Sequence, residues 1–167
     1  MARLAHRATD VELSLAARTR VIYADTDRMG IVYHGSYLRF MEFARVEFMR
    51  NLGVVYAEME RKGWGLPVTD LAVTYLAPAR YDDLVSLWVG LAKVTYARVN
   101  FTYELAVEPG DRVATDGPSE GRIVLLHAET RHGSVRLDDG RATRMPDEVH
   151  TRLHEMYTQR RLPEPTA

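Results

Sequence analysis

The segment after Ser36 constrains the fold of this chain most, because it predicts a helix that is apolar on nearly every side. Apolar residues recur at helical spacing from Tyr37 to Leu52, and further apolar residues fill the other faces. A helix with this pattern is buried in a core. With Ser36 as the N-cap and Gly53 as the C′ residue, it contains about 16 residues and is roughly 24 Å long.

Most of the remaining sequence reads as β-strands separated by turns. One strand is expected before the helix, at residues 18–24, and four after it, at residues 67–76, 84–94, 99–107 and 122–137. The last four lack crossover helices between them, so they cannot be parallel. The economical arrangement is an α+β architecture in which an antiparallel sheet wraps around the long helix. Its edge strands need a partner, which favours a homodimer.

The chain of 167 residues is expected to form a single domain. That domain spans residues 18–161, preceded by an N-terminal extension at residues 1–17 and followed by a flexible tail at residues 162–167. Within it, residues 54–62 predict a short helix and residues 108–121 a polar loop. Pro146 opens a final helix that runs to about residue 161.

Composition and charge exclude several classes of function. The formal net charge of −1 gives no reason to expect nucleic acid or an anionic membrane as a partner. The chain has no cysteine, which excludes a thiol nucleophile, thiolate metal ligands and disulfides and fits a reducing compartment. No apolar run approaches the roughly 20 residues that span a bilayer, and the N-terminus does not read as a signal peptide. A cytoplasmic protein is therefore expected.

The loop from Asp25 to Gly35 predicts a chemical site. The N-terminus of a buried helix presents unpaired N–H groups and a partial positive charge, which together bind anions or stabilise an oxyanion. Gly30 permits a tight turn or the close approach of a ligand. Asp27 lies about one turn before the helix, where it should stay ionised and could attack a carbonyl or activate water. The alternative is that these residues only form a turn and a cap.

Residues 23–50 closely resemble the active-site signature of hotdog-fold acyl-CoA thioesterases of the 4-hydroxybenzoyl-CoA thioesterase family. The resemblance is closest to the branch that includes the Tol–Pal-associated bacterial thioesterases, and it continues in residues 66–68 and 75–83. The matching residues in the signature are Asp25-Thr26-Asp27, Gly30, Val32-Tyr33-His34, Tyr37, Glu42 and Ala44-Arg45.

This resemblance implies a hotdog fold and assigns roles to particular residues. Asp27 matches the catalytic carboxylate, and the backbone N–H of His34 matches the group that polarises the thioester carbonyl. The His34 side chain and Tyr23 match positions that line the site, and Tyr23 is included among the expected catalytic residues. Substrate contacts are expected from Gly30, Val32, Tyr33, Tyr37 and Glu42. The chain departs from the family pattern at Arg28-Met29, which affects the expected choice of acyl group.

Other residues compete for these roles. Glu42 on the long helix is the second candidate for the catalytic carboxylate, although an ion pair with Arg45 or Arg39 is its expected role. Arg98 and Arg131 are candidates for binding the phosphates of CoA. His150 and His154 have the i, i+4 spacing of metal ligands, but without a third ligand a solvated helix face is expected.

The predicted function is hydrolysis of an acyl-CoA or acyl-carrier protein thioester, with no metal or redox cofactor. One alternative is a non-catalytic module that binds acyl thioesters in the same pocket. Another is a hotdog dehydratase, whose histidine and acidic residue are placed differently. The sequence leaves open the acyl group, the choice between a nucleophilic and a general-base role for Asp27, and the choice between a homodimer and a homotetramer.

Overall fold

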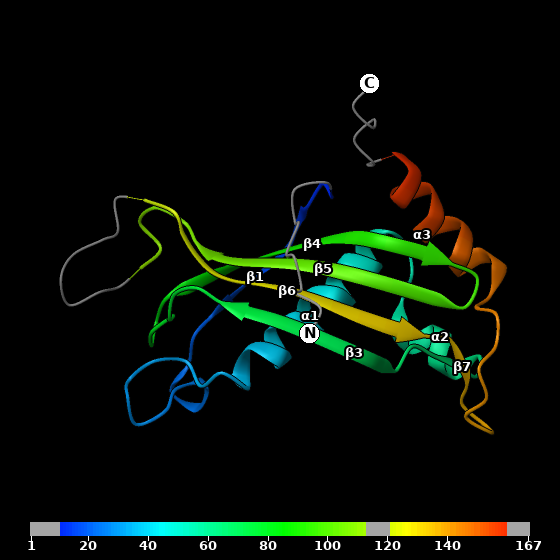
Figure 1. The fold of residues 1–167 in the computed structure, drawn as a ribbon, viewed down its shortest axis with the longest axis horizontal. Helices are drawn as coiled ribbons and strands as arrows, with labels where there is room; N and C mark the ends of the chain where they lie inside the picture. The colour runs from blue at the N-terminus through cyan, green and yellow to red at the C-terminus, as the bar shows by residue number, and fades with distance from the viewer. Residues whose placement is uncertain (1–10, 113–120, 160–167) are drawn as a thin grey trace, which may run out of the picture.

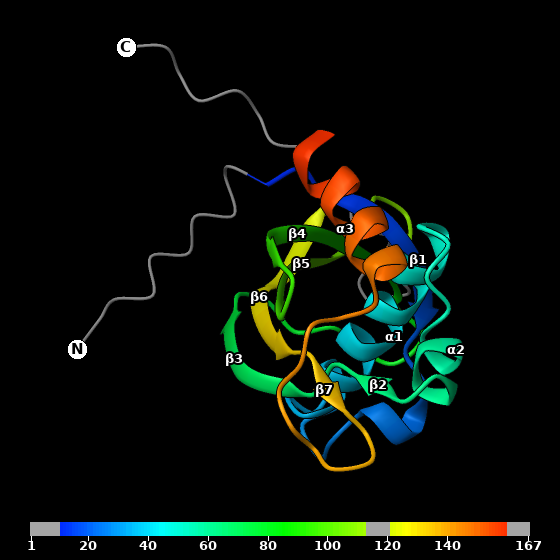
Figure 2. The same ribbon diagram turned by 90° about the vertical axis from the view of Figure 1, so that its right-hand side faces the viewer.

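The computed structural model describes residues 11–112 and 121–159. Five antiparallel strands form one sheet in the order β1-β4-β5-β6-β3, and helix α1 lies inside the curve of this sheet (Figures 1 and 2). The elements are β1 (Ser14–Arg20), α1 (Ser36–Asn51), β3 (Val68–Tyr75), β4 (Leu84–Thr95), β5 (Arg98–Val107) and β6 (Ile123–Gly133). The predicted α+β arrangement, an antiparallel sheet around one long buried helix, is confirmed.

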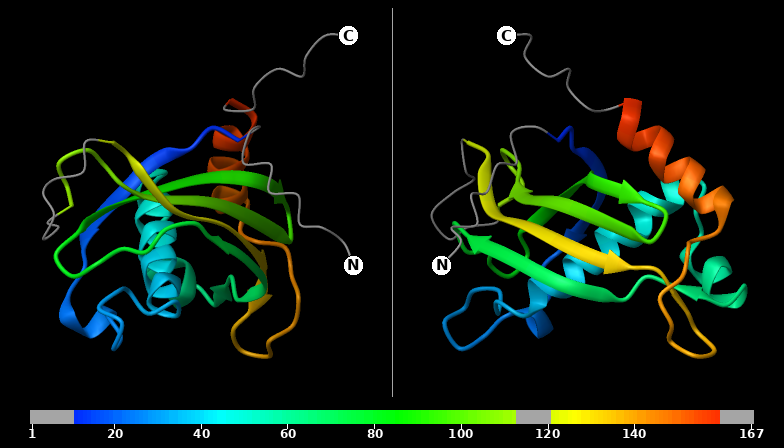
Figure 3. Two further views of the ribbon diagram at one scale, coloured as in Figure 1. Left: turned by 60° about the vertical axis from the view of Figure 1, so that its left-hand side comes forward. Right: turned by 45° about the vertical axis from the view of Figure 1, so that its right-hand side comes forward.

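Smaller elements lie at the ends of the sheet and of α1. The 3-10 turn η2 (Tyr23–Asp25) precedes α1, and the short helix α2 (Tyr56–Arg61) follows it as predicted. Strands β2 (Trp64–Gly65) and β7 (Val135–Arg136) form a separate antiparallel ribbon. Helix α3 (Asp147–Gln159) packs beside β4 (Figure 3). None of the described helices is long and apolar enough to cross a bilayer.

The core lies between α1 and the inner face of the sheet. Phe48 of α1 meets Phe101 of β5 edge to face, with ring centroids 6.3 Å apart. Tyr103 and Leu105 occupy the next alternate positions of β5 and are equally buried, because alternate side chains of a strand share one face. The buried residues of α1 lie on more than one side of the helix, as its sequence predicted; they are Tyr37, Phe40, Met41, Ala44, Arg45, Phe48 and Met49.

The sequence prediction is wrong about the N-cap of α1 and right about its C′ residue. Ser36 is the first helical residue rather than the N-cap, and its hydroxyl donates to the Asp25 carbonyl at 3.1 Å instead of capping the helix. Gly53 is the C′ residue, as predicted, with φ +76°. The Gly53 N–H donates to the Arg50 carbonyl at 2.8 Å and the Val54 N–H to the Met49 carbonyl at 2.9 Å, which is a Schellman motif.

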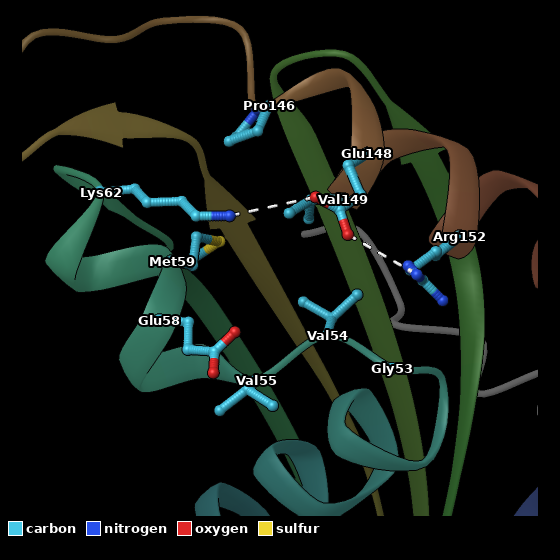
Figure 4. A pocket seen from close by; sticks show the side chains of 10 residues that line it. All are labelled: Gly53, Val54, Val55, Glu58, Met59, Lys62, Pro146, Glu148, Val149 and Arg152. Atoms are coloured by element: carbon cyan, nitrogen blue, oxygen red, sulfur yellow. Dashed lines mark ion pairs between the residues drawn. The ribbon is translucent and has the colours of Figure 1, made fainter.

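The C-terminal end of α1 meets α2 and α3 around a small cavity of about 40 Å³ (Figure 4). Glu148 of α3 forms ion pairs with Lys62, at 4.0 Å, and with Arg152, at 3.6 Å. Exposed pairs of this kind contribute little to stability. The apolar side chains of Val54 and Val149, which line the cavity, therefore contribute more to holding α3 in place.

Two predicted strands differ from the observed ones. The strand predicted at residues 18–24 lies at Ser14–Arg20, because the Asp25 carboxylate accepts the Ile22 N–H at 3.0 Å and bends the chain into η2. The strand predicted at residues 122–137 is interrupted at Ser134, whose N–H donates to the Ala97 carbonyl at 2.8 Å. The predicted polar loop at residues 108–121 lies partly outside the described residues, and the predicted flexible tail at residues 162–167 lies wholly outside them. The division into residues 1–17, 18–161 and 162–167 stays a prediction.

Candidate functional site

The residues between η2 and α1 form a compact loop closed by backbone hydrogen bonds. Thr26 and Val32 pair as an isolated antiparallel bridge, and the Asp27 N–H donates to the Ile31 carbonyl at 2.9 Å. The Gly30 N–H donates to the Asp27 carbonyl at 3.0 Å, and Gly30 has φ +71°. A residue with a Cβ adopts that conformation only with strain, so Gly30 serves the tight turn that the sequence predicted.

Asp27 is half-buried and lines a pocket of about 380 Å³ at the N-terminal end of α1, here named the helix-entrance pocket. Its Oδ1 accepts the Met29 N–H at 2.8 Å, which fixes the carboxylate over the loop. Asp27 forms no ion pair with any of the described residues. The pocket is lined by Asp27, Met29, Ile31, Val32, His34, Tyr37, Tyr75, Leu76, Ala77 and Pro78.

His34 lines the same pocket and lies just before α1 begins. Its carbonyl oxygen accepts the Tyr75 O–H at 2.9 Å. Within residues 11–112 and 121–159, its amide N–H has no hydrogen-bond acceptor. An unpaired N–H at the positive end of a helix favours negative charge beside it. The pocket therefore combines an amide donor with the Asp27 carboxylate, two groups that suit acyl transfer.

Asp25, the other aspartate of the loop, is held by the fold. It is 2% exposed, its Oδ1 is paired with the Arg39 guanidinium, and its Oδ2 accepts the Ile22 N–H. Its carbonyl oxygen accepts the Tyr33 N–H at 2.8 Å. Because these contacts occupy both carboxylate oxygens, Asp25 positions the loop, and Asp27 is the carboxylate available for chemistry.

Two tyrosines build the wall of the helix-entrance pocket opposite the loop. The Tyr37 hydroxyl accepts the Ala79 N–H at 3.0 Å, and the Tyr37 and Tyr75 rings lie 5.7 Å apart between centroids. Burial raises the pKa of both phenols above the ordinary value, so both hydroxyls are neutral at neutral pH. They are hydrogen-bonding groups of the wall rather than acids or bases. Val32 lies beside them, and its N–H donates to the Ala79 carbonyl at 2.9 Å.

Six of the predicted site residues do not line the helix-entrance pocket: Glu42, Arg98 and Arg131, which line other pockets, and Tyr23, Gly30 and Tyr33. Tyr23 is 74% exposed and stacks on Tyr81, with ring centroids 3.9 Å apart. Tyr33 is also exposed, with its ring against that of His34 at 4.2 Å. Gly30 belongs to the loop and shapes it. The structure thus places Asp27, Val32, His34 and Tyr37 together, and it places Tyr23 apart from them.

Glu42 lies further along α1 and lines a second pocket, of about 270 Å³, here named the Arg45 pocket. The predicted ion pair of Glu42 with Arg45 or Arg39 is wrong: Arg39 pairs with Asp25, and Arg45 forms no ion pair among the described residues. The Arg45 guanidinium lies 5.5 Å from the Tyr56 ring centroid. The pocket is lined by Leu38, Met41, Glu42, Arg45, Val68, Leu71, Tyr103, Thr130 and His132.

Arg98 and Arg131 come together with Lys93 around a third, larger pocket of about 730 Å³, here named the basic pocket. Arg131 pairs there with Glu129, at 3.0 Å, and with Asp70, at 3.6 Å. The basic pocket includes Thr69 and Asp70 of β3, whereas the helix-entrance pocket includes Tyr75 at the other end of that strand. Within one chain, these arginines therefore do not join Asp27.

A buried chain of hydrogen bonds that the sequence reasoning missed runs behind the Arg45 pocket. The His132 Nδ1 lies 2.8 Å from the Leu66 carbonyl and its Nε2 lies 2.8 Å from the Thr130 hydroxyl, which is 3.0 Å from the Tyr103 hydroxyl. A carbonyl only accepts, so Nδ1 carries the proton and Nε2 accepts the Thr130 O–H. Thr130 and His132 share one face of β6, and their alternation with charged residues was the available signal.

Burial fixes the protonation states of His132 and Tyr103 in this series of hydrogen bonds. Burial, together with the Arg45 charge, lowers the pKa of His132 from 6.5 to about 4, and burial raises the pKa of Tyr103 to about 12. Both groups are neutral at neutral pH. Arg45 is therefore the charged member of this cluster.

The low pKa of His132 predicts a stability that falls in weak acid. The unfolded chain takes up a proton on His132 near pH 6.5, and the folded chain does so only near pH 4. The contribution of neutral His132 to the free energy of unfolding is therefore full above pH 6.5 and is lost as the pH falls toward 4. The loss is about 3 kcal/mol over that window, and about 2 kcal/mol between pH 7.5 and 5. Urea unfolding at these two pH values should show a smaller loss for His132→Asn than for the wild type. Equal losses in the two proteins would contradict this origin.

The two histidines with metal-ligand spacing belong to an aromatic stack. The His150 ring lies 5.3 Å from that of His154 and 3.9 Å from that of Tyr96, between centroids. Within the described part of the chain, no cluster of three or more potential metal ligands is present.

A curved antiparallel sheet around a buried helix, with an acidic loop and an unpaired amide at the start of that helix, defines a hotdog fold with a candidate acyl-transfer site. The sequence model of the thioesterase-like superfamily matches residues 21–153. The chain therefore belongs to this superfamily, and the predicted hotdog fold and thioesterase class of enzyme are confirmed.

Individual proteins to which the chain is similar have thioesterase names. The chain is similar to the putative acyl-CoA thioesterase YneP of Bacillus subtilis, with 44% identity over 71 residues that cover 41% of this chain and 51% of YneP, about half its length. It is 29% identical to the acyl-CoA thioesterase YbgC of Haemophilus influenzae over 82% of this chain and 92% of YbgC. The crystal structure of a DHNA-CoA thioesterase from Staphylococcus aureus superposes with a TM-score of 0.71 at 28% identity, covering 89% of each chain.

Proposed function

We propose that this protein hydrolyses the thioester of an acyl-CoA, or of an acyl-carrier protein, in the helix-entrance pocket. The observation that carries the proposal is that Asp27 and His34 line the same pocket, and that the His34 N–H has no acceptor within the described residues. The family and the names of the relatives support this reaction class. No metal or redox cofactor is required by it.

The reaction follows from the placement of these two groups. The thioester carbonyl oxygen accepts the His34 N–H, and the positive end of α1 stabilises the negative charge that develops on this oxygen. Asp27 then either attacks the carbonyl carbon or removes a proton from an attacking water. The first route expels the thiolate and forms an anhydride that water hydrolyses. The second expels the thiolate directly, and the products of both are the free acid and the thiol.

The basic pocket is the proposed place for the phosphates of CoA. Arg98, Arg131 and Lys93 line it, and arginine suits phosphate because its guanidinium donates two parallel hydrogen bonds. Glu129 and Asp70 already pair with Arg131 and would compete with a phosphate there. Arg98 is therefore the stronger candidate of the two predicted arginines.

Self-association is proposed along strand β3. This strand pairs with β6 on one side, and among the described residues it has no strand on the other. Val68, Leu71 and Tyr75 of this edge are exposed, and an edge strand with apolar side chains favours pairing with another chain. A second copy would satisfy this edge in a homodimer, or within a homotetramer.

The place of the protein within its family and cell is also proposed. The signature in residues 23–50 favours the branch of Tol–Pal-associated thioesterases. The absence of cysteine from the full sequence favours a cytoplasmic location.

The test of the proposed function is release of free thiol from a panel of short, long and aromatic acyl-CoAs. The best substrate is expected to reach a kcat/KM of about 10⁴ M⁻¹s⁻¹ or more, the lower range for enzymes on their own substrates. Calorimetric binding of acyl-CoAs without thiol release across the whole panel would overturn hydrolysis and leave a binding module.

A further inference from the structure

Arg45 is a buried cation that the proposed reaction does not use. Its side chain is 9% exposed and lines the Arg45 pocket. Its Nη1 is shielded from solvent and donates to no acceptor, and no carboxylate of the described residues forms an ion pair with it. The Tyr56 ring, 5.5 Å from the guanidinium, offsets part of the cost of burying this charge, but Nη1 still lacks an acceptor, so Arg45 can take an anionic partner.

Among the described residues that line the pocket, Arg45 is the charged group on the buried, inner side, and Glu42 lies on the exposed, outer side. The Tyr103 O–H donates to Thr130, the Thr130 O–H donates to His132, and the His132 Nδ1–H donates to Leu66. These protons point along the chain of hydrogen bonds and are unavailable to a ligand. Met41 and Leu71 supply apolar walls. The pocket therefore offers apolar surface and a single cationic donor, a combination that fits an aliphatic chain ending in an anion.

Glu42 is the carboxylate among the residues that line the Arg45 pocket, and it does not neutralise Arg45. It is exposed, lines the same pocket, and forms no ion pair among the described residues. Its charge opposes an incoming anion from the outer side, whereas the Arg45 charge attracts that anion on the inner side. Removing the Glu42 charge should therefore raise the affinity for an anionic ligand, and removing the Arg45 charge should lower it.

The Arg45 pocket lies further along the same helix and strand as the helix-entrance pocket. From Ser36 to Arg45 the helix rises by about 14 Å, at 1.5 Å per residue. From Tyr75 to Leu71 strand β3 covers about 13 Å, at 3.3 Å per residue. A ligand with its thioester at His34 would place the far end of a medium-length chain near the Arg45 guanidinium.

We propose that the Arg45 pocket binds a carboxylate, and that this carboxylate is the far end of the acyl group. The substrate class is then a thioester of a dicarboxylic acid, with Arg45 as the counter-ion of the free carboxylate. This assignment to the acyl group rests on the proposed function, whereas carboxylate binding by the pocket does not.

The hydrolysis arm compares ω-carboxyacyl-CoAs, from succinyl to sebacyl, with methyl-ended acyl-CoAs of the same length. The wild type should prefer carboxylate-ended substrates, most strongly at adipyl or suberyl length. Arg45→Met should lower the ratio of the two kcat/KM values by about tenfold or more, because it removes the counter-ion. Glu42→Gln should raise the ratio. Arg50→Met, which removes an exposed arginine of the same helix, is the matched control and should keep the ratio of the wild type.

The binding arm measures suberate by calorimetry and needs no catalysis, so it decides the carboxylate site even if no thioester is hydrolysed. Binding to the wild type and its loss in Arg45→Met support the site. If suberate binds but Arg45→Met leaves the ratio of the two kcat/KM values unchanged, the carboxylate site stands and its link to the acyl group is overturned.

The melting temperature of Arg45→Met separates ligand binding by Arg45 from a purely structural role. Arg45→Met should melt at the same or a higher temperature, because an unpaired buried charge is replaced by an apolar side chain. A lower Tm or a changed oligomeric state, together with no suberate binding and no preference for carboxylate-ended substrates in the wild type, would overturn the proposal.

Discussion

Replacing Asp27 by asparagine is expected to lower kcat for acyl-CoA hydrolysis by about 10²- to 10⁴-fold, the range for loss of a positioned acid or base. Asparagine keeps the shape of the side chain and can still accept the Met29 N–H, so the loop and the pocket should remain folded. What is lost is the negative charge, which both routes of the reaction need. Steady-state thiol release on the best substrate of the wild type measures the effect, and circular dichroism verifies the fold.

Asp25→Asn provides the matched comparison, because it makes the same chemical change two residues away. Asp25 pairs with Arg39 and accepts the Ile22 N–H, so its substitution should lower the free energy of unfolding by about 1–3 kcal/mol through weakened charge-assisted bonds. Urea unfolding separates this outcome from a chemical one. A kcat of Asp27→Asn equal to that of the wild type would remove Asp27 from the reaction.

The parts of the site that the sequence predicted are those set by local structure. A buried helix follows from the apolar residues after Ser36, and the loop before it contains a glycine where the backbone needs positive φ. Asp27 and His34 lie within a few residues of the start of that helix, so placing the helix also places them. Local spacing was enough to bring a carboxylate and an amide donor into one pocket.

The parts that the sequence did not predict depend on contacts between distant segments. Arg39 pairs with Asp25 rather than Glu42, because the turn η2 brings Asp25 against the first turns of α1. His132 meets Leu66 across 66 positions, and no local pattern indicates that contact. Tyr23 stacks on Tyr81 outside the pocket for the same reason. Such side chains are placed by the register of the sheet and by loop geometry, which periodicity does not encode.

The turn at residues 78–83 shows how such a contact supports the site. In the sequence it reads as a proline-containing break between strands and as part of the family resemblance, and neither indicates its contacts. In the fold, Ala79 accepts the Val32 N–H and donates to Tyr37, so this turn holds one wall of the helix-entrance pocket. Asp83 anchors the turn: its carboxylate accepts the Arg80 N–H at 2.9 Å and pairs with Arg112 at 3.1 Å.

Asp83→Asn is therefore expected to lower the free energy of unfolding by about 3–5 kcal/mol, the cost of removing one partner from a buried ion pair. The Asp83 side chain is 0% exposed and that of Arg112 is 16% exposed, so the remaining arginine charge is poorly hydrated. The corresponding fall in Tm is roughly 6–20 °C for a chain of this size.

Asp82→Asn is the control for this prediction, since it removes the same charge from the adjacent residue. The Asp82 side chain is 39% exposed and the backbone has φ +68°, a conformation that asparagine tolerates, and the ion pair with Arg20 lies at the surface. Its substitution should change the unfolding free energy by less than about 0.5 kcal/mol. Thermal unfolding of the two variants side by side measures the difference. Equal melting temperatures would show that the buried pair does not anchor the turn, and the wall of the pocket would then depend on the backbone bonds of Ala79 alone.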